Sequence, residues 1–172
     1  MQNVGKRFEQ DWIKSVPDYV GVLRIPDAAQ SFYKSSNLRF SKKNPFDFLF
    51  WCPKTLTLYA LELKTVKGKS ISFERTKEEH GGIHYHQIVG LENFEKIGEC
   101  VCGFVIEFRE LETTIFLPIS EFLELQSTIT KKSFNYNDLV NNHITFITIP
   151  QQILKTHYRY DIEYFLKETA LH

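Results

Sequence analysis

The sequence predicts a mixed α/β (α+β) domain in which helices flank a sheet of short strands. Apolar residues at helical spacing open the chain, and two β-favouring runs in the middle are separated by a short polar break. A second pair of β-favouring runs follows, with helical patterns before and after it. Strands and helices arranged in this way are typical of a sheet covered by helices.

Taken in order, the first predicted helix spans residues 4–16 and a short strand spans residues 19–25. Periodicity assigns no structure to residues 28–45, which are polar, basic and aromatic. The prediction of the first helix is based on five apolar residues at helical spacing: Val4, Phe8, Trp12, Ile13 and Val16. The later elements expected are a short strand (70–73), a helix (84–97), an antiparallel strand pair (100–108 and 113–117), a helix (120–126), a strand (144–149) and a closing helix (160–170).

The composition fits one compact domain over residues 1–172. The 172 residues are 42% hydrophobic and 15% aromatic, with 8 glycines and 6 prolines, which suits a sizeable core rather than a disordered chain. No apolar run is long enough for a transmembrane helix, and the first residues lack the apolar stretch of a signal peptide. The three cysteines lack the second pair that a zinc site needs, and we expect reduced thiols in a cytoplasmic protein.

The most informative stretch lies between Asp47 and Lys64. An apolar run over 48–51 and a longer one over 56–64 are separated by a Pro-containing break, which predicts a hairpin. Because side chains alternate along a strand, Glu62 and Lys64 share a face, and the hairpin can bring Asp47 beside Glu62. The second run is otherwise apolar on both faces, which is typical of a central strand, where an unpaired charge is costly.

This set of residues suits a metal-dependent nuclease. Mg²⁺ is commonly held by one or two carboxylates with phosphate and water, so Asp47 and Glu62 are candidate ligands, and the Leu63 carbonyl can add another. Lys64 can orient the attacking water or stabilise charge on the phosphate. The alternative is that Asp47 is a turn residue and that Glu62 and Lys64 form an exposed strand edge.

Further polar residues have two open interpretations each. Glu9, at the margin of the first helix's apolar face, either reaches solvent or enters the site as a third acid. Gln87 lies on the core-facing stripe of helix 84–97, where it either satisfies a buried partner or faces the site. For His80, His84 and His86 taken singly, a structural or surface role is favoured.

The formal net charge is zero, but the charges are segregated along the chain. Residues 34–69 carry eight Lys or Arg against two acids, a balance of +6, whereas residues 91–124 carry eight Glu against two basic residues, a balance of −6. The basic segment contains the candidate site, as a phosphate-backbone substrate requires. The alternative is an ordinary solvated surface.

Four segments, in their order and spacing, resemble the RecU family of Holliday-junction resolvases, within the PD-(D/E)xK nuclease superfamily. The resemblance covers about residues 4–125. Two features depart from the family: Asn44-Pro45-Phe46-Asp47 replaces a Thr-Thr-Asp pattern, and the helix motif is one residue tighter. The four segments are Gly5-Lys-Arg-Phe8-Glu9, Pro45-Phe-Asp47, Glu62-Leu-Lys64 and His84-Tyr-His86-Gln87-Ile88.

The resemblance implies a restriction-endonuclease-like fold with a protruding stalk at residues 28–43. It implies that Asp47 and Glu62 bind Mg²⁺, for which Mn²⁺ can substitute, and that Lys64 is the catalytic lysine. Glu9 would be an accessory acid, and Gln87 would support the site. The candidate DNA-contacting residues are Phe32, Tyr33, Arg39, Phe40, Lys42 and Lys43 in the stalk, and Lys67, Lys69, His84 and His86 outside it.

The function expected is therefore a metal-dependent endonuclease that resolves four-way DNA junctions in recombination and repair. It would act as a homodimer, with a recombinase as a candidate partner, in the cytoplasm of a bacterial or phage-infected cell. Two alternatives remain: another PD-(D/E)xK nuclease of restriction or repair type, and a DNA-binding recombination-accessory protein. Intact Asp47, Glu62 and Lys64 argue against the accessory protein.

Overall fold

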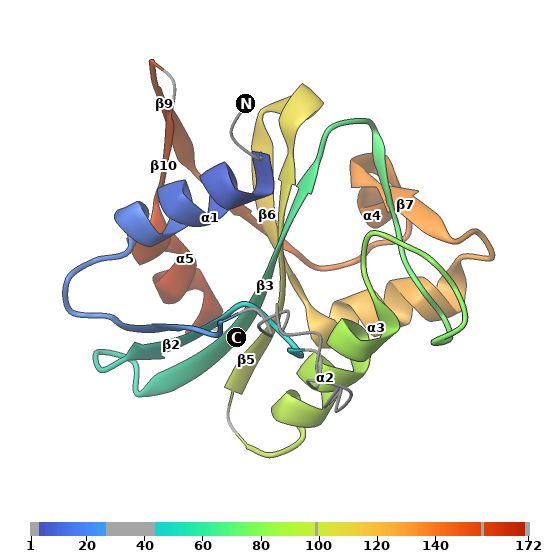
Figure 1. Cartoon of the computed structure of the whole chain (residues 1–172), viewed down its shortest axis with the longest axis horizontal. Helices are drawn as coiled ribbons and strands as arrows, with labels where there is room; N and C mark the ends of the chain where they lie inside the picture. The colour runs from blue at the N-terminus through green and yellow to red at the C-terminus, as the bar shows by residue number, and fades with distance from the viewer. Residues whose placement is uncertain (1–3, 27–43, 99, 156, 171–172) are drawn as a thin grey trace, which may run out of the picture.

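A six-stranded mixed sheet with helices on both faces forms the body of the molecule (Figure 1). The computed structural model describes residues 4–26, 44–98, 100–155 and 157–170. The strand order is β1-β2-β3-β5-β6-β8; β3 and β5 are parallel, and all other neighbours are antiparallel. This arrangement confirms the α+β class that the sequence predicts.

The elements have the following bounds. The sheet contains β1 (Gly21–Arg24), β2 (Phe48–Cys52), β3 (Thr57–Val66), β5 (Cys100–Phe108), β6 (Thr113–Pro118) and β8 (Ile147–Ile149). Two antiparallel ribbons pair β4 (Ser70–Ser72) with β7 (Ser133–Asn135) and β9 (Gln151–Leu154) with β10 (His157–Tyr160). The helices are α1 (Val4–Ser15), α2 (Tyr85–Glu95), α3 (Ile119–Thr128), α4 (Tyr136–Asn141) and α5 (Ile162–Thr169), with a 3₁₀ turn η1 (Arg109–Leu111).

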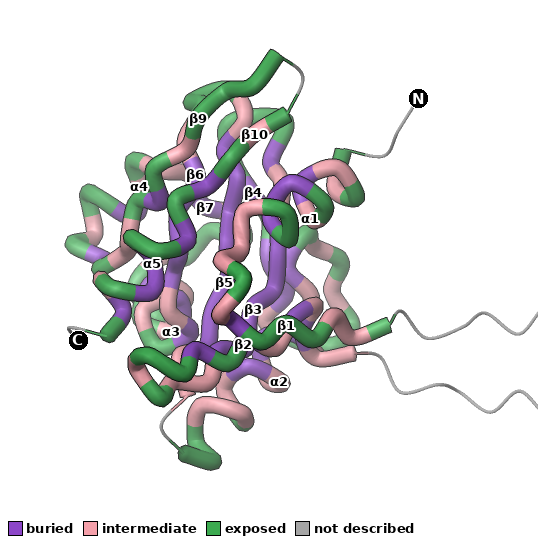
Figure 2. Tube along the Cα trace, turned by 90° about the vertical axis from the view of Figure 1, so that its left-hand side faces the viewer, coloured by how far each residue is buried: buried purple, intermediate pink, exposed green. Residues whose placement is uncertain are grey.

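Each face of the sheet is covered by its own layer of helices. Helices α1 and α5 pack on one face and α2 and α3 on the other, which gives two separate apolar clusters. The alternation of side chains along β3 divides between them: Tyr59, Leu61 and Leu63 lie among the α1 and α5 residues, and Ala60 and Val66 lie in the other cluster. Strands β3 and β5 form the buried centre of the molecule (Figure 2).

Strand β3 is a central strand, as its apolar faces predict. It pairs with β2 on one side and with β5 on the other, and the predicted hairpin is present with Phe48 opposite Leu61. Strand β2 begins at Phe48, so β3 continues beyond the end of its hairpin partner. The residues of β3 after Leu61 therefore have an open edge on the β2 side.

Several boundaries differ from the sequence-based expectation. The closing helix begins at Ile162 rather than at residue 160, because Asp161 accepts a hydrogen bond from the Tyr164 N–H (2.9 Å) and so caps the helix. Tyr160 instead ends β10. The strand expected over 144–149 is limited to Ile147–Ile149, and Ile13, assigned to the apolar face of the first helix, is 38% exposed.

Further predictions concern the cysteines, membrane-spanning helices, the stalk and the elements after α3. Cys52, Cys100 and Cys102 are free thiols, as predicted. None of the helices in the described ranges is long and apolar enough to cross a membrane. The stalk proposed for residues 28–43 lies outside the described residues. The elements β7, α4, β9 and β10 were not predicted.

The β2–β3 turn provides a test of the local backbone. Leu56 has a φ of 53° and is 75% exposed, so a left-handed conformation is occupied by a residue that disfavours it. We expect Leu56→Asn to raise the free energy of unfolding by about 0.5–1 kcal/mol, because Asn tolerates this conformation. Urea denaturation measures the change. Leu56→Ala is the control, because alanine removes the apolar side chain but keeps the strain; equal stability of the two variants would contradict the explanation.

Candidate active site

The first carboxylate is placed by the start of the hairpin. Asp47 directly precedes β2, and its N–H donates to the Leu61 carbonyl (3.1 Å). In return, the Leu63 N–H donates to Asp47 Oδ2 (2.9 Å). The Asp47 side chain thus occupies the open edge of β3, beside Glu62, as the predicted hairpin requires.

The second carboxylate belongs to a buried polar cluster on the α2 side of the sheet. Glu62 Oε1 lies 3.0 Å from Lys64 Nζ and also accepts a hydrogen bond from Gln87 Nε2. Gln87 Oε1 accepts from Lys64 Nζ (2.9 Å) and from the His84 N–H (3.0 Å). Both interpretations of Gln87 therefore hold at once: it satisfies buried partners, and those partners are the candidate site residues.

Burial dominates the electrostatics of both acids. It raises the pKa of Glu62 to about 8; Asp47 adds to the shift, and Lys64 opposes it. Burial also raises the pKa of Asp47, against the opposing effect of the Leu63 N–H bond and of the Lys64 and Arg24 cations, while Glu9 adds to the rise. Two neighbouring carboxylates in a poorly solvated site favour a bound cation, which stabilises their ionised forms.

Glu9 approaches the site from α1 and is paired with a residue that the sequence did not single out. Arg24 Nε and Nη2 lie 3.0 Å and 2.9 Å from Glu9 Oε2. Arg24 faces Phe48 in the β1–β2 register, so it is adjacent to Asp47, the residue before Phe48. A single arginine at the end of a short strand belongs to no recognisable sequence motif. Its position next to Asp47 becomes clear only from the β1–β2 strand register.

The position of α2 depends on a buried carboxylate that also lacked a sequence signal. Glu74 Oε2 accepts from the Tyr85 N–H (2.7 Å) at the first turn of α2, and Glu74 Oε1 accepts from the Gly81 N–H (3.1 Å) and contacts His84 Nδ1 (2.7 Å). Burial alone would raise the pKa of Glu74, but these hydrogen bonds together lower it to about 2. Glu74 thereby fixes the end of α2 from which Gln87 reaches the site.

The residues fit a divalent cation as an oxygen-donor site. In a strand, the N–H and C=O of one residue point to the same side, so the Leu63 carbonyl points, like its N–H, toward Asp47. Two carboxylates and one carbonyl suit Mg²⁺, which keeps several waters and takes further ligands from substrate phosphate. In the part of the chain that the structure describes, no group of three or more His, Cys, Asp or Glu side chains is placed to hold a metal ion.

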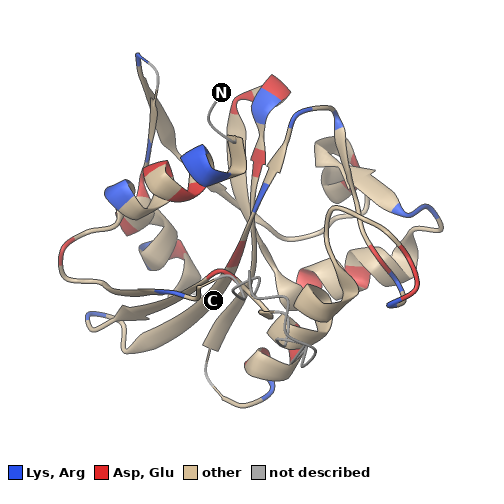
Figure 3. Ribbon diagram, in the orientation of Figure 1, with Lys and Arg blue, Asp and Glu red and all other residues tan. Residues whose placement is uncertain are grey.

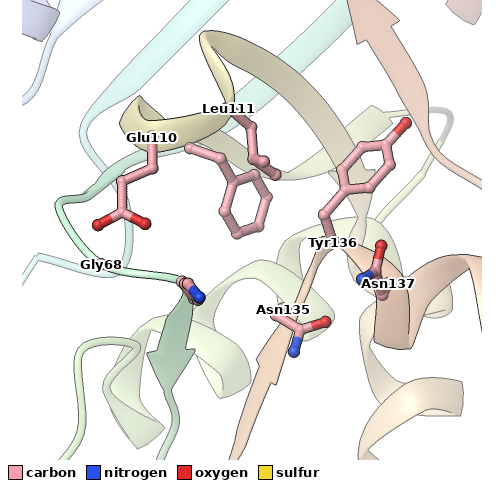
Figure 4. A pocket seen from close by; sticks show the side chains of 8 residues that line it. Gly68, Glu110, Leu111, Asn135, Tyr136 and Asn137 are labelled. Atoms are coloured by element: carbon pink, nitrogen blue, oxygen red, sulfur yellow. The ribbon is translucent and has the colours of Figure 1, made fainter.

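Among the DNA-contacting candidates outside the stalk, His84 contacts the cluster through its backbone N–H, which donates to Gln87 Oε1 (3.0 Å). Lys67 and Lys69 lie in the β3–β4 loop, and Lys69 lines a cavity of about 310 Å³ beyond the end of β3 (Figure 4). The rings of His84 and His86 stack at 5.4 Å, and His86 lines a groove of about 770 Å³ between α2 and residues 44–46. Phe32, Tyr33, Arg39, Phe40, Lys42 and Lys43 lie outside the described residues.

Comparison with known proteins places the chain in a family. No family model matches it. It is 32% identical over 155 residues to the SPbeta prophage-derived uncharacterized protein YotM of Bacillus subtilis (strain 168), and the match covers 88% of this chain and 74% of that protein. The chain belongs to the family of this prophage-derived protein.

A solved structure, that of Hjc from Archaeoglobus fulgidus, a Holliday junction resolvase, is similar to this chain with a TM-score of 0.48. The sequence identity is 16%, and the alignment covers 78% of this chain and 90% of Hjc.

The cap formed by Glu74 predicts a dependence of stability on pH. Because the folded state lowers the pKa of Glu74 from 4.5 to about 2, its contribution is present above about pH 4.5 and is lost as the pH falls toward 2. Glu74→Gln cannot accept all of these hydrogen bonds, so we expect it to be less stable at pH 7 by about 1–3 kcal/mol and less sensitive to pH between 4.5 and 2.

Urea unfolding of both proteins over this pH range is the measurement. Glu78→Gln, an exposed acid four residues further on, is the control and should behave as the parent. If Glu74→Gln kept the full acid sensitivity of the parent, Glu74 would not be its source.

Proposed function

We propose that the protein is a divalent-metal-dependent endonuclease of the PD-(D/E)xK type that cuts four-way DNA junctions. The observation that carries the proposal is the meeting of Asp47, Glu62 and Lys64 at the open edge of β3, with Gln87 bonded to both Glu62 and Lys64. A buried cluster of this polarity in a central strand is expensive to maintain, which favours a chemical role over a purely structural one.

Asp47, Glu62 and the Leu63 carbonyl would hold Mg²⁺, for which Mn²⁺ can substitute. When bound, the metal supplies a water of lowered pKa and neutralises charge on the scissile phosphate. Glu62 lies on β3 and Asp47 directly precedes β2, so the β2–β3 register fixes the backbone positions from which the two carboxylates project. A fixed backbone geometry of this kind helps to hold the phosphate and the attacking water in the orientation that the reaction needs.

Lys64 would act on the reacting phosphate. Its ammonium group is held between Glu62 Oε1 and Gln87 Oε1 at 3.0 Å and 2.9 Å. A lysine fixed in this way can orient the attacking water or stabilise the negative charge that develops as the P–O bond breaks. Gln87 is a positioning residue: its carbonyl oxygen holds Lys64 and its amide nitrogen holds Glu62.

Glu9 and Arg24 would complete the edge of the site. Their ion pair sits beside Asp47, so Arg24 offsets the charge of the acids. Glu9 is then an accessory acid, held in place by Arg24. The sequence had also offered Glu9 as a third acid of the site, but nothing in the sequence indicated Arg24 as its partner.

The junction as substrate rests on the resemblance to RecU resolvases. Residues 28–43 would form the stalk that enters the junction, with aromatic residues stacking on exposed bases and cations contacting phosphates. Two symmetric cuts would be made by a homodimer. The prophage-derived relative fits a phage-related enzyme of the bacterial cytoplasm, where recombination intermediates are its natural substrate.

Cleavage of a labelled synthetic four-way junction, beside the matching duplex and a flap, tests the proposal. We expect paired symmetric nicks on the junction in Mg²⁺ and no cutting in EDTA. Cutting of the duplex or flap alone would indicate another nuclease of the same superfamily. Binding without cutting in Mg²⁺ or Mn²⁺ would contradict nuclease activity and indicate an accessory protein.

Removal of either metal ligand should separate binding from cutting. We expect Asp47→Ala and Glu62→Ala to abolish cleavage while DNA binding is kept or strengthened, because an acid that repels phosphate is removed. Gel-based cleavage and fluorescence anisotropy measure the two properties. Glu78→Ala is the control for loss of an exposed acid. Cleavage by either ligand variant at the parental rate would disprove the metal-site assignment.

Lys64 should affect the chemical step. We expect Lys64→Ala to lower the single-turnover cleavage rate by about 10²-fold or more, the range for one positioned group, with a small change in junction affinity. Lys167→Ala, which removes an exposed lysine of α5, is the control for the loss of one positive charge. Loss of affinity without loss of rate would show that Lys64 contacts DNA but takes no part in hydrolysis.

A further inference from the structure

The β9–β10 ribbon extends from the body of the molecule, beside α1 (Figures 1 and 2). Residues 151–160 contain no Asp or Glu and carry Lys155, His157 and Arg159, all of which are exposed. Ile153 and Leu154 are also exposed, at 54% and 41%. A two-stranded ribbon is marginal in water by itself, so contacts with the body must hold it in place.

Strand β10 of the ribbon is anchored to α1 along its length, and a buried acid holds the end next to the β9–β10 turn. Asp11 is only 2% exposed; its Oδ1 lies 3.0 Å from His157 Nδ1, and its Oδ2 accepts from the Tyr158 N–H (3.1 Å). The Tyr160 N–H donates to Ser15 Oγ (3.0 Å), and Arg159 Nη1 donates to the Lys14 carbonyl. These bonds fix the direction of the ribbon relative to α1.

The outer surface of α1 and the ribbon together form a basic face, here called the α1–ribbon face. Both acids of α1 are already paired, Glu9 with Arg24 and Asp11 with the ribbon. By contrast, helices α2 and α3 carry acidic segments (Figure 3): Glu92, Glu95 and Glu121 are half-buried and Glu124 is exposed. The cations of the α1–ribbon face are Lys6, Arg7, Lys14, Lys155 and Arg159.

This face is continuous with the candidate active site. Glu9 projects from one flank of α1 toward Arg24 and Asp47, and Asp11 projects from the other flank toward the ribbon. An α-helix is about 10 Å wide, so the ribbon begins roughly one helix width from the site. Lys14 adjoins the ribbon, because its carbonyl accepts from Arg159, so a DNA backbone that crosses α1 there would pass Lys14 before the ribbon turn that carries Lys155.

We propose that the α1–ribbon face binds the phosphate backbone of the DNA arm that flanks the cleaved phosphodiester. The inference rests on the proposed function and extends it, since no sequence motif assigned a role to residues 151–160. Charge favours DNA over a second copy of this chain, because two such basic faces would repel each other. The exposed Ile153 and Leu154 are the feature that a second copy would use.

The test is the salt dependence of junction binding by the variant Lys14→Ala/Lys155→Ala, measured by anisotropy in EDTA. The plot of log K against log salt has a negative slope, and each lost phosphate contact makes that slope less negative by about 0.9. The double variant should therefore make the slope less negative by about 2, so the affinity gap between the parent and the variant should narrow about tenfold between about 50 mM and 200 mM salt. Neither side chain takes part in the hydrogen bonds that anchor the ribbon.

Lys96→Ala/Lys167→Ala is the matched control. It removes the same charge from the exposed ends of α2 and α5, and should bind as the parent does. If Lys14→Ala/Lys155→Ala kept the parental slope while the parent bound and cut the junction, the α1–ribbon face would be excluded and the nuclease proposal would stand. If the parent bound but never cut, with the double variant weaker, the nuclease proposal would fail alone.

Two further outcomes overturn the inference. A parent that binds no DNA would contradict both proposals. A change of oligomeric state in Ile153→Ser/Leu154→Ser, with an unchanged salt slope in the lysine variant, would assign the ribbon to self-association instead. Analytical ultracentrifugation of the serine variant at the concentrations used for binding measures that state.

Discussion

The polar cluster of Glu62, Lys64 and Gln87 inside a hydrophobic sheet is the constraint on which the rest of the structure depends. Glu62 is 3% exposed and lies on a strand that is covered on both faces. A carboxylate in such surroundings must be protonated, paired or bound to a cation. Gln87 and Lys64 supply the pairing, and they do so only if α2 lies at one position along the sheet.

Two contacts set that position. Glu74 holds the first turn of α2 through the Tyr85 N–H. Further along the helix, Gly90 lies against the segment before Asp47: a Cβ at Gly90 would come within 2.3 Å of the Pro45 Cβ. Helix α2 therefore locates both acids, Glu62 through Gln87 and Asp47 through the Gly90–Pro45 contact. Larger residues at position 90 would displace the chain that carries the first carboxylate.

Features with strong local patterns could be predicted from the sequence. The β2–β3 hairpin and the β5–β6 pair are marked by β-favouring apolar runs with short breaks between them. The alternation of side chains along β3 was enough to place Glu62 and Lys64 on one face beside Asp47. The same logic identified Gln87, because a polar residue on a core-facing stripe needs a partner. These predictions succeeded because each depends on residues close together in the chain.

What could not be predicted depends on distant residues. Ribbon β9–β10 is held by Asp11 and Ser15, more than 140 positions away. Helix α4 is a different case, because its cap, Asn135, is adjacent but its six residues are too few to show a helical period. Arg24 lies beside Asp47 because of the β1–β2 register. Glu74 can accept from the Gly81 and Tyr85 N–H groups only because the chain turns back near Gly81. The stalk residues remain a prediction, as do the junction as substrate and the homodimer.

The most direct test of the central claim is the location of a metal ion. A crystal of the protein with a short DNA strand and Mn²⁺, measured for anomalous scattering, shows where the cation binds. We expect a peak between the Asp47 and Glu62 carboxylates, about 2.0–2.3 Å from their oxygens and close to the Leu63 carbonyl. A metal bound elsewhere, with Glu62 still paired only to Lys64 and Gln87, would contradict it.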